Sequence, residues 1–174
     1  EYERHSPLVI ATVGAKTYLS DLKNICEYDS SEGTFRTIYK GQYTISDASM
    51  DQDGVFWLAS AEGLVRYDPR TGKSELINTS LFQDVASVVA DNQYRIWIGT
   101  RRHLFVYSSR THNFATLEEV DGVLPNEYIF HATLLADNGD VFVGGTTGMT
   151  VINSAVHFDT DEDYTVELLD VLLN

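Results

Sequence analysis

The fold of this chain is decided by residues 91–107, DNQYRIWIGTRRHLFVY. This stretch reads as a turn, a strand over residues 95–100, a short connection and a second strand over residues 104–107. The same arrangement occurs once more upstream, in residues 51–68, DQDGVFWLASAEGLVRYD. Two copies of one unit indicate that the chain is built from repeats.

The spacing of the two copies indicates the architecture. Trp57 is followed by Trp97, and Tyr67 by Tyr107, in each case 40 residues later. A period near 40 with four short strands per unit is typical of β-propeller blades, whereas helical and leucine-rich repeats have other periods. The period therefore predicts an all-β fold of four-stranded antiparallel sheets.

Four such units account for most of the chain. We expect about four blades of an incomplete ring, near residues 5–40, 43–79, 84–119 and 128–157. The first unit is expected to lack one strand, because residues 13–23 read as a long connection. After the last unit, residues 158–174 are expected to form an acidic linker and the first strand of a following domain.

Residues that recur at fixed places in the units are expected to be structural. A flat aromatic side chain on the second strand can fill the wedge between neighbouring sheets, so we interpret the tryptophans as core residues rather than ligand contacts. Phe142 stands at the tryptophan position of the last unit. The structural set is Trp57, Gly63, Tyr67, Trp97, Gly99, Tyr107, Phe142, Gly144 and Gly145.

The composition argues against several functions. The chain has 174 residues, 43% of them hydrophobic, which is enough to bury a core. Its net charge of −14 would repel a phosphate backbone, so no nucleic-acid partner is expected. The single cysteine, Cys26, excludes an internal disulfide, and its core-facing position predicts an inert buried thiol. No apolar run is long enough for a membrane-spanning helix, so we expect no membrane contact by this segment.

The repeat resembles the propeller repeats of hybrid two-component system sensors, which are histidine kinases that span the membrane. The shared pattern is D-x-x-G/N-x-x-W-[IL]-G-T followed by G-L and Y-D, carried by residues 53–68 and 95–107. The last unit is similar to the closing repeat of such regions, with Gly144-Gly145 in place of Gly-Thr. The departures are His103 for the second glycine, Ser108 for aspartate, and Ala59-Ser60 for Gly-Thr.

This resemblance implies a function as well as a fold. It implies a periplasmic, non-catalytic sensing segment of a longer protein, anchored in the membrane by other parts and responding to polysaccharide breakdown products. It also implies that a small β-sandwich follows, beginning in residues 164–174. The start at Glu1, without Met, likewise predicts a piece of a longer protein. Because propellers of this family have more than four blades, two sheet faces would be exposed, and we expect a homodimer or poor behaviour in solution.

Connections that converge on one face of a propeller are the usual place for a binding site. Arg101 and Arg102 are adjacent in a chain with only 12 basic residues, and they can hold an acidic sugar through its carboxylate. The alternative is that both are exposed and paired with nearby acids. Asn126, Tyr128 and His131 can offer hydrogen bonds and a stacking face to a sugar, or they can line the core or the channel. The candidate ligand residues are Arg101, Arg102, His103, Asn126, Tyr128 and His131.

Other chemistries find little support in the sequence. The five histidines show no metal-ligand spacing, and the acidic run at residues 159–163 lacks the glycine and distal glutamate of a calcium loop, so no metal and no cofactor are expected. A propeller glycoside hydrolase or lyase would need two carboxylates about 5–9.5 Å apart. The candidate acids Asp21, Glu62, Asp84 and Glu127 lie in no recognisable motif. A protein-interaction scaffold is the third alternative, and the sensor is favoured by the repeat.

Overall fold

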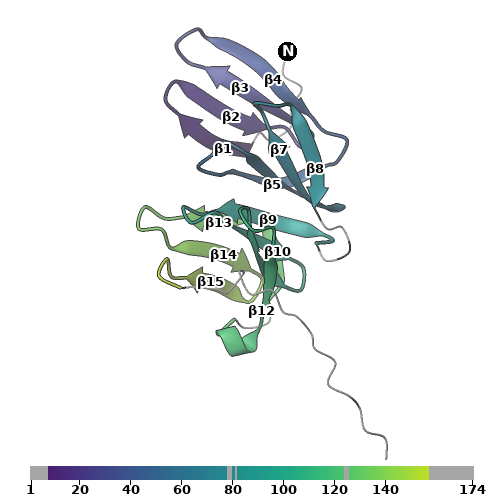
Figure 1. Ribbon diagram of the computed structural model, residues 1–174, viewed down its shortest axis with the longest axis vertical. Helices are drawn as coiled ribbons and strands as arrows, with labels where there is room; N and C mark the ends of the chain where they lie inside the picture. The colour runs from purple at the N-terminus through teal and green to yellow at the C-terminus, as the bar shows by residue number, and fades with distance from the viewer. Residues whose placement is uncertain (1–7, 78–79, 81, 124–125, 157–174) are drawn as a thin grey trace, which may run out of the picture.

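Four antiparallel sheets follow one another in chain order, from the purple N-terminal sheet to the yellow-green last one (Figure 1). This computed structural model describes residues 8–77, 80, 82–123 and 126–156. Three sheets have four strands and the last has three, and in each sheet the strands pair in sequence order. The fold is therefore the all-β array of propeller blades that the repeat period predicts, and we number the sheets blades 1 to 4.

The strand bounds show how regular the repeat is. Blade 1 consists of β1 (Leu8–Val13), β2 (Lys16–Ser20), β3 (Asn24–Asp29) and β4 (Thr34–Lys40). Blade 2 consists of β5 (Ile45–Met50), β6 (Phe56–Ser60), β7 (Gly63–Asp68) and β8 (Lys73–Ile77). Blade 3 consists of β9 (Val85–Ala90), β10 (Arg95–Thr100), β11 (Leu104–Ser108) and β12 (Phe114–Leu117). A short 3-10 helix, η1 (Glu119–Asp121), precedes blade 4, which consists of β13 (Tyr128–Leu135), β14 (Val141–Gly145) and β15 (Gly148–Ile152).

Blade 1 is complete, so the expectation that the first unit lacks a strand is wrong. The supposed long connection contains β2, which pairs with β1 through a two-residue turn at Gly14 and Ala15. Gly14 has a φ of 59°, a conformation that suits glycine and lets the chain reverse in so few residues. The true β2–β3 connection is residues 21–23, where the Asp21 carboxylate accepts hydrogen bonds from the backbone N–H groups of Lys23 and Asn24.

The blades pack face to face through the aromatic residue of the second strand. Trp57 is fully buried and shares a core with Val88, Ile96 and Ile98 of blade 3. Trp97 is fully buried in the core that blade 3 forms with blade 4. Tyr18 takes the same position in blade 1, and its ring meets Phe56 of blade 2 edge-on with centroids 5.2 Å apart. These side chains fill the wedge between sheets, as the sequence predicts.

The first strands of the blades lie side by side, with β9 in contact with both β5 and β13. Each first strand has an irregular register with its second strand, between Val9 and Ala11, Ile45 and Asp47, and Tyr128 and Thr133, and opposite Gly99 and Thr100 in blade 3. Such bulges bend a strand and re-aim its side chains. The largest register shift is in β13, between Tyr128 and Thr133, and it determines how His131 and its neighbours are oriented.

Candidate functional site

A buried aspartate fastens each tryptophan to the turn before it. Asp51 accepts hydrogen bonds from Trp57 Nε1 at 2.8 Å and from the N–H groups of Asp53 and Val55, both at 3.0 Å. Asp91 does the same for Trp97 Nε1 at 2.9 Å, and it also accepts from Arg95 Nε at 2.6 Å. The function of this contact is structural, because it satisfies an indole N–H in the core.

Blade 4 lacks both partners of this contact. Ala136 stands at the aspartate position. Its backbone N–H donates to the carbonyl of Asp140, four residues later, and the N–H groups of Asp51 and Asp91 make the same bond in blades 2 and 3. Phe142 stands at the tryptophan position, six residues after Ala136, and its ring has no N–H that needs an acceptor. Sequence reasoning missed the aspartate, although Asp51 and Asp91 are separated by the repeat period.

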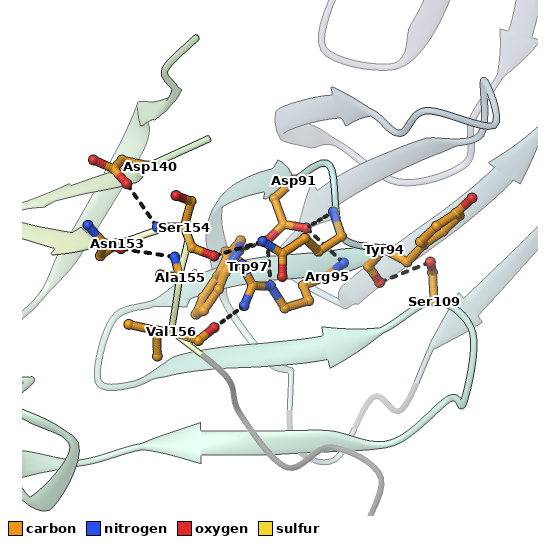
Figure 2. A network of polar contacts seen from close by, with 11 residues as sticks. Asp91, Tyr94, Arg95, Trp97, Ser109, Asp140, Asn153, Ser154, Ala155 and Val156 are labelled. Atoms are coloured by element: carbon orange, nitrogen blue, oxygen red, sulfur yellow. Dashed lines mark hydrogen bonds and ion pairs between the residues drawn. The ribbon is translucent and has the colours of Figure 1, made fainter. Parts of the chain in front are cut away.

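The chain leaves blade 4 through contacts with blade 3, shown in Figure 2. Arg95 Nη1 donates to the Val156 carbonyl at 2.6 Å, and Gln93 Nε2 donates to the Ser154 carbonyl at 2.7 Å. The Ser154 N–H donates to Asp140 of blade 4 at 2.8 Å. Arg95 is buried, and its guanidinium lies 5.1 Å from the centroid of the Trp97 ring. Arg95 thus links the exit segment, residues 153–156, to Asp91, which also holds Trp97.

The six predicted ligand residues separate into three hollows. Arg102, His103, Asn126 and Tyr128 line a cavity of about 400 Å³ between blades 3 and 4, which we call the blade 3–4 pocket. Arg101 and Tyr128 line a groove of about 290 Å³ that also touches blade 2, the blade 2–4 groove. His131 lines a third hollow of about 330 Å³ beside the first strands, the inner hollow. The pocket therefore brings four of the six together.

The two arginines of the β10–β11 connection are exposed. Within the part of the chain that the structure describes, neither Arg101 nor Arg102 has a carboxylate within 4.0 Å. His103 replaces glycine without adopting a positive φ. The Thr100 hydroxyl accepts hydrogen bonds from the N–H groups of Arg102 at 3.3 Å and His103 at 3.0 Å, which holds the turn in place of the glycine.

Two pocket residues have structural contacts as well. Asn126 Oδ1 accepts from the Thr147 N–H at 3.1 Å, and Asn126 Nδ2 donates to the Gly148 carbonyl at 3.1 Å. Tyr128 is 3% exposed, its ring packs on Gly99, and its hydroxyl lies 3.1 Å from Thr150 Oγ1. Burial raises the pKa of Tyr128, partly offset by that hydrogen bond. Both residues shape the pocket wall.

The pocket combines both signs of charge with apolar walls. Glu118 and Glu119 lie at its margin with Arg102 and His103, and the apolar lining is Leu104, Leu117, Val120 and Val123. A carboxylate can be held by a guanidinium, sugar hydroxyls can donate to glutamates, and the apolar face of a pyranose can lie on aliphatic side chains. The pocket thus offers a cation, hydrogen-bond acceptors and an apolar surface to a small polar molecule.

Two apolar side chains that line the blade 2–4 groove were not predicted from the sequence. Ile129 and Phe130 are exposed, although they lie in an apolar run of a strand. They belong to the four residues of β13 between Tyr128 and Thr133 that have no paired partner in β14. The bulge turns them outward, and a register shift of this kind leaves no mark in an apolar sequence.

His131 lies in the inner hollow and bridges blades 4 and 2. Its Nδ1 lies 3.1 Å from Asp47 Oδ1, and Thr133 Oγ1 donates to Asp47 Oδ2 at 3.3 Å. Asp47 is buried and also accepts from the Val88 N–H at 2.9 Å. The hydrogen bond to Asp47 raises the pKa of His131, with burial opposing it. His131 therefore makes a contact between blades and lines a different hollow from the four pocket residues.

The same residues also bear on metal binding, membrane insertion and thiol chemistry. Among the described residues, no group of three or more His, Cys, Asp or Glu side chains is placed to hold a metal ion. The described part of the chain also contains no helix of the length and apolarity that a membrane span needs. Cys26 is a free, buried thiol. The acidic run at residues 159–163, His5, His157 and the expected following domain lie outside the described residues.

Repeated antiparallel sheets that pack on one another through aromatic side chains of their second strands define a β-propeller repeat protein. Its blades are similar to the extracellular domain of BT3049 from B. thetaiotaomicron, which is described as a hybrid two component system. The TM-score is 0.65 at 16% identity, over 87% of this chain and 22% of that one. The extracellular domain of BT4673, from the same organism and described as a one component system, matches with a TM-score of 0.64 at 25% identity, over 90% of this chain and 21% of that one.

These comparisons support the resemblance that the repeat suggests, while this chain spans only about a fifth of the solved domains, 21–22% of their length. The N-terminal domain of Nup159 matches as well, with a TM-score of 0.51 at 14% identity, over 79% of this chain and 38% of that one. No protein-family model and no curated protein matches the sequence. The fold is shared by proteins with different names, so function has to be argued from the site.

Proposed function

We propose that this chain is part of the extracytoplasmic ligand-sensing region of a hybrid two-component histidine kinase. The observation that carries the proposal is the match of 87–90% of the chain to extracellular domains of proteins described as two component or one component systems. The segment itself is non-catalytic and periplasmic. The membrane-spanning and kinase parts belong to a longer protein, in keeping with the small share of the solved domains that this chain spans.

The ligand in this proposal is an oligosaccharide from polysaccharide breakdown that carries a carboxylate. It binds the blade 3–4 pocket, with the carboxylate on Arg102, hydroxyl groups on Glu118 and Glu119, and the sugar ring against Leu104 and Val120. Support comes from the volume of about 400 Å³, the size of a small-molecule site, and from Arg102, which has no carboxylate within 4.0 Å among the described residues.

A thermal-shift screen of the 174-residue chain against neutral and acidic oligosaccharides tests this proposal. At a ligand concentration of 100 times Kd, binding stabilises the folded state by about 2.7 kcal/mol, which raises Tm by about 5–10 °C. Arg102→Ala should lose the shift with the acidic sugar. Lys73→Ala, a basic side chain on the outer strand β8, is the matched control and should keep it. A shift that Arg102→Ala keeps would remove the pocket from the proposal.

One observation favours an enzyme as the second candidate. Asp84 and Glu127 both line the blade 2–4 groove, whereas Asp21 and Glu62 line none of the three hollows. Turnover of the same oligosaccharides by the unmodified chain, lost in Glu127→Gln, would establish a hydrolase or lyase. Binding without turnover supports the sensor.

A further inference from the structure

The blade 3–4 pocket and the blade 2–4 groove meet along a narrow boundary. In the β10–β11 connection, Arg102 lines the pocket and Arg101, the residue before it, lines the groove. At the entry to β13, Asn126 lines the pocket and Glu127, the residue after it, lines the groove, while Tyr128 lines both. Consecutive Cα atoms are about 3.8 Å apart, so each of these two connections passes from one hollow to the other within a single residue. The link between two neighbouring sugar units can cross such a boundary.

The groove lies between blades that already pack on one another. Its lining comes from three consecutive blades, with Ser46 on β5 of blade 2, Val85 on β9 of blade 3 and Phe130 on β13 of blade 4. The Ser46 hydroxyl donates to the Val85 carbonyl at 2.7 Å, which joins blades 2 and 3 beside the groove. Strand β9 in turn contacts both β5 and β13. The groove is therefore a feature of the packed array of blades 2 to 4.

The side chains of the groove offer both polar and apolar contacts. Phe130 and Ile129 are 59% and 44% exposed, so an aromatic ring and a branched aliphatic side chain are open to a ligand. Arg101 supplies a cation, and Asp84 and Glu127 supply two carboxylates. A sugar ring has a face of C–H groups that can lie on the Phe130 ring, and its hydroxyl groups can donate to carboxylates and accept from a guanidinium. The groove thus fits one sugar unit.

The charges of the groove favour a neutral unit over an acidic one. Two carboxylates, Asp84 and Glu127, accompany a single cation there. In the pocket, the imidazole of His103 accompanies Arg102, whereas no histidine is among the described residues that line the groove. Because like charges placed together are unfavourable, a second carboxylate is a poor occupant of the groove.

We infer that the groove is a second subsite for the same ligand, an oligosaccharide with its acidic unit in the blade 3–4 pocket and a neutral unit in the blade 2–4 groove. This inference rests on the proposed function, because it starts from an acidic unit in the pocket. The adjacent arginines then hold neighbouring units of one chain, Arg102 through the carboxylate of the first and Arg101 through a hydroxyl oxygen of the second. A site of this kind discriminates between a short oligosaccharide and a single acidic sugar.

Isothermal titration calorimetry of the 174-residue chain tests the second subsite. The probes are a hexuronic acid and the di- and trisaccharides that link it to neutral hexoses, chosen from the acidic oligosaccharides that raise Tm in the thermal-shift screen. The oligosaccharide should bind about tenfold more tightly than its hexuronic acid alone, a difference of about 1.4 kcal/mol. Phe130→Ala and Arg101→Ala should each remove most of that gain. Phe35→Ala, at a phenylalanine that is 63% exposed on β4 and lines none of the three hollows, is the matched control and should keep it.

The outcomes separate the groove from the pocket. If no acidic sugar binds the unmodified chain, or if Arg102→Ala binds the probes unchanged, the pocket is wrong and the second subsite is overturned with it. If the hexuronic acid binds as tightly as the oligosaccharide and Arg102→Ala loses both, the pocket stands and only the second subsite is overturned. A gain that survives in either Phe130→Ala or Arg101→Ala would also overturn it, because the second unit would then lie outside the groove. Circular dichroism confirms that each variant is folded.

Discussion

Individual side chains in this protein fasten the blades from within. The Asp91 carboxylate accepts four hydrogen bonds, from Trp97 Nε1, from Arg95 Nε and from the N–H groups of Gln93 and Arg95. Asp51 holds Trp57 in the same way but has no arginine. The two aspartates therefore form a natural comparison of one repeated contact with and without a buried ion pair.

Asp91→Ala should destabilise the chain more than Asp51→Ala. Removing Asp91 leaves the buried guanidinium of Arg95 without its carboxylate, which costs about 3–5 kcal/mol. Removing Asp51 leaves an indole N–H and backbone groups unsatisfied, at about 1–3 kcal/mol. Urea unfolding followed by tryptophan fluorescence gives both free energies, and equal losses would contradict the distinction.

The contact of His131 with Asp47 between blades 4 and 2 should depend on pH. The hydrogen bond to Asp47 raises the pKa of His131 above its ordinary value, with burial opposing it. A group with a raised folded-state pKa stabilises the fold fully below its unfolded pKa, and the stabilisation is lost as pH rises through the folded pKa. The Tm difference between the unmodified chain and His131→Gln should therefore be larger at pH 6 than at pH 8.5. His103→Gln, at an exposed position, is the control, and a difference independent of pH would argue against the contact.

At the scale of the strands, small residues of the second strand set how closely blades approach. A Cβ on Gly99 would lie 2.4 Å from Ser87 Oγ and 2.9 Å from Tyr128 Cβ. Blade 2 has Ala59 at this position, where it shares a core with Val85, the residue equivalent to Tyr128 by strand pairing. Blade 2 therefore accepts Ala59 in place of glycine because the facing residue is Val85, which is smaller than Tyr128.

Gly99→Ala should cost about 1–3 kcal/mol through overpacking. Tyr128→Val in the same chain should recover part of that loss, because it recreates the Ala59–Val85 pairing of blade 2. A double-mutant cycle measured by urea unfolding gives the coupling between the two sites. Strictly additive losses would show that the close approach of Gly99 and Tyr128 is unimportant.

The strands also show what the sequence could predict. The 40-residue period, the blade class and the tryptophans could be predicted because hydrophobic alternation and turn residues are local signals. The second strand of blade 1 could not, since Tyr18 replaces tryptophan and a two-residue turn hides the hairpin. The structure distributes the six candidate ligand residues over three hollows. Arg102, His103, Asn126 and Tyr128 meet in one pocket, but His131 lies elsewhere because a bulge in β13 shifts its register, which depends on packing between blades.

At the scale of the whole molecule, blade 3 connects the pocket with the chain exit. Its β10–β11 connection supplies Arg102 and His103 to the pocket, and the turn before β10 supplies Gln93 and Arg95 to residues 153–156. One end of β10 therefore leads to the pocket and the other to residues 153–156, and every residue of the strand is buried. A displacement of β10 would move both the pocket and residues 153–156.

Arg95→Met should release the exit segment while keeping the packing of the side-chain stem on Trp97. Hydrogen exchange of residues 153–156 should become faster, since the hydrogen bond to the Val156 carbonyl is lost. Arg110→Met, which changes an arginine stacked on Tyr94 at 3.5 Å, is the matched control and should leave that exchange unchanged. Unaltered exchange in Arg95→Met would show that the clamp does not hold the segment.

Hydrogen exchange of the 174-residue chain with and without acidic oligosaccharides tests the central claim most directly. If the blade 3–4 pocket is the sensing site, the ligand slows exchange in residues 102–104 and 117–120, which line it, and Arg102→Ala abolishes the change. Slower exchange confined to residues 129–131 would place the ligand in the neighbouring hollows. Exchange that no oligosaccharide alters would contradict the claim that this part of the molecule binds the signal.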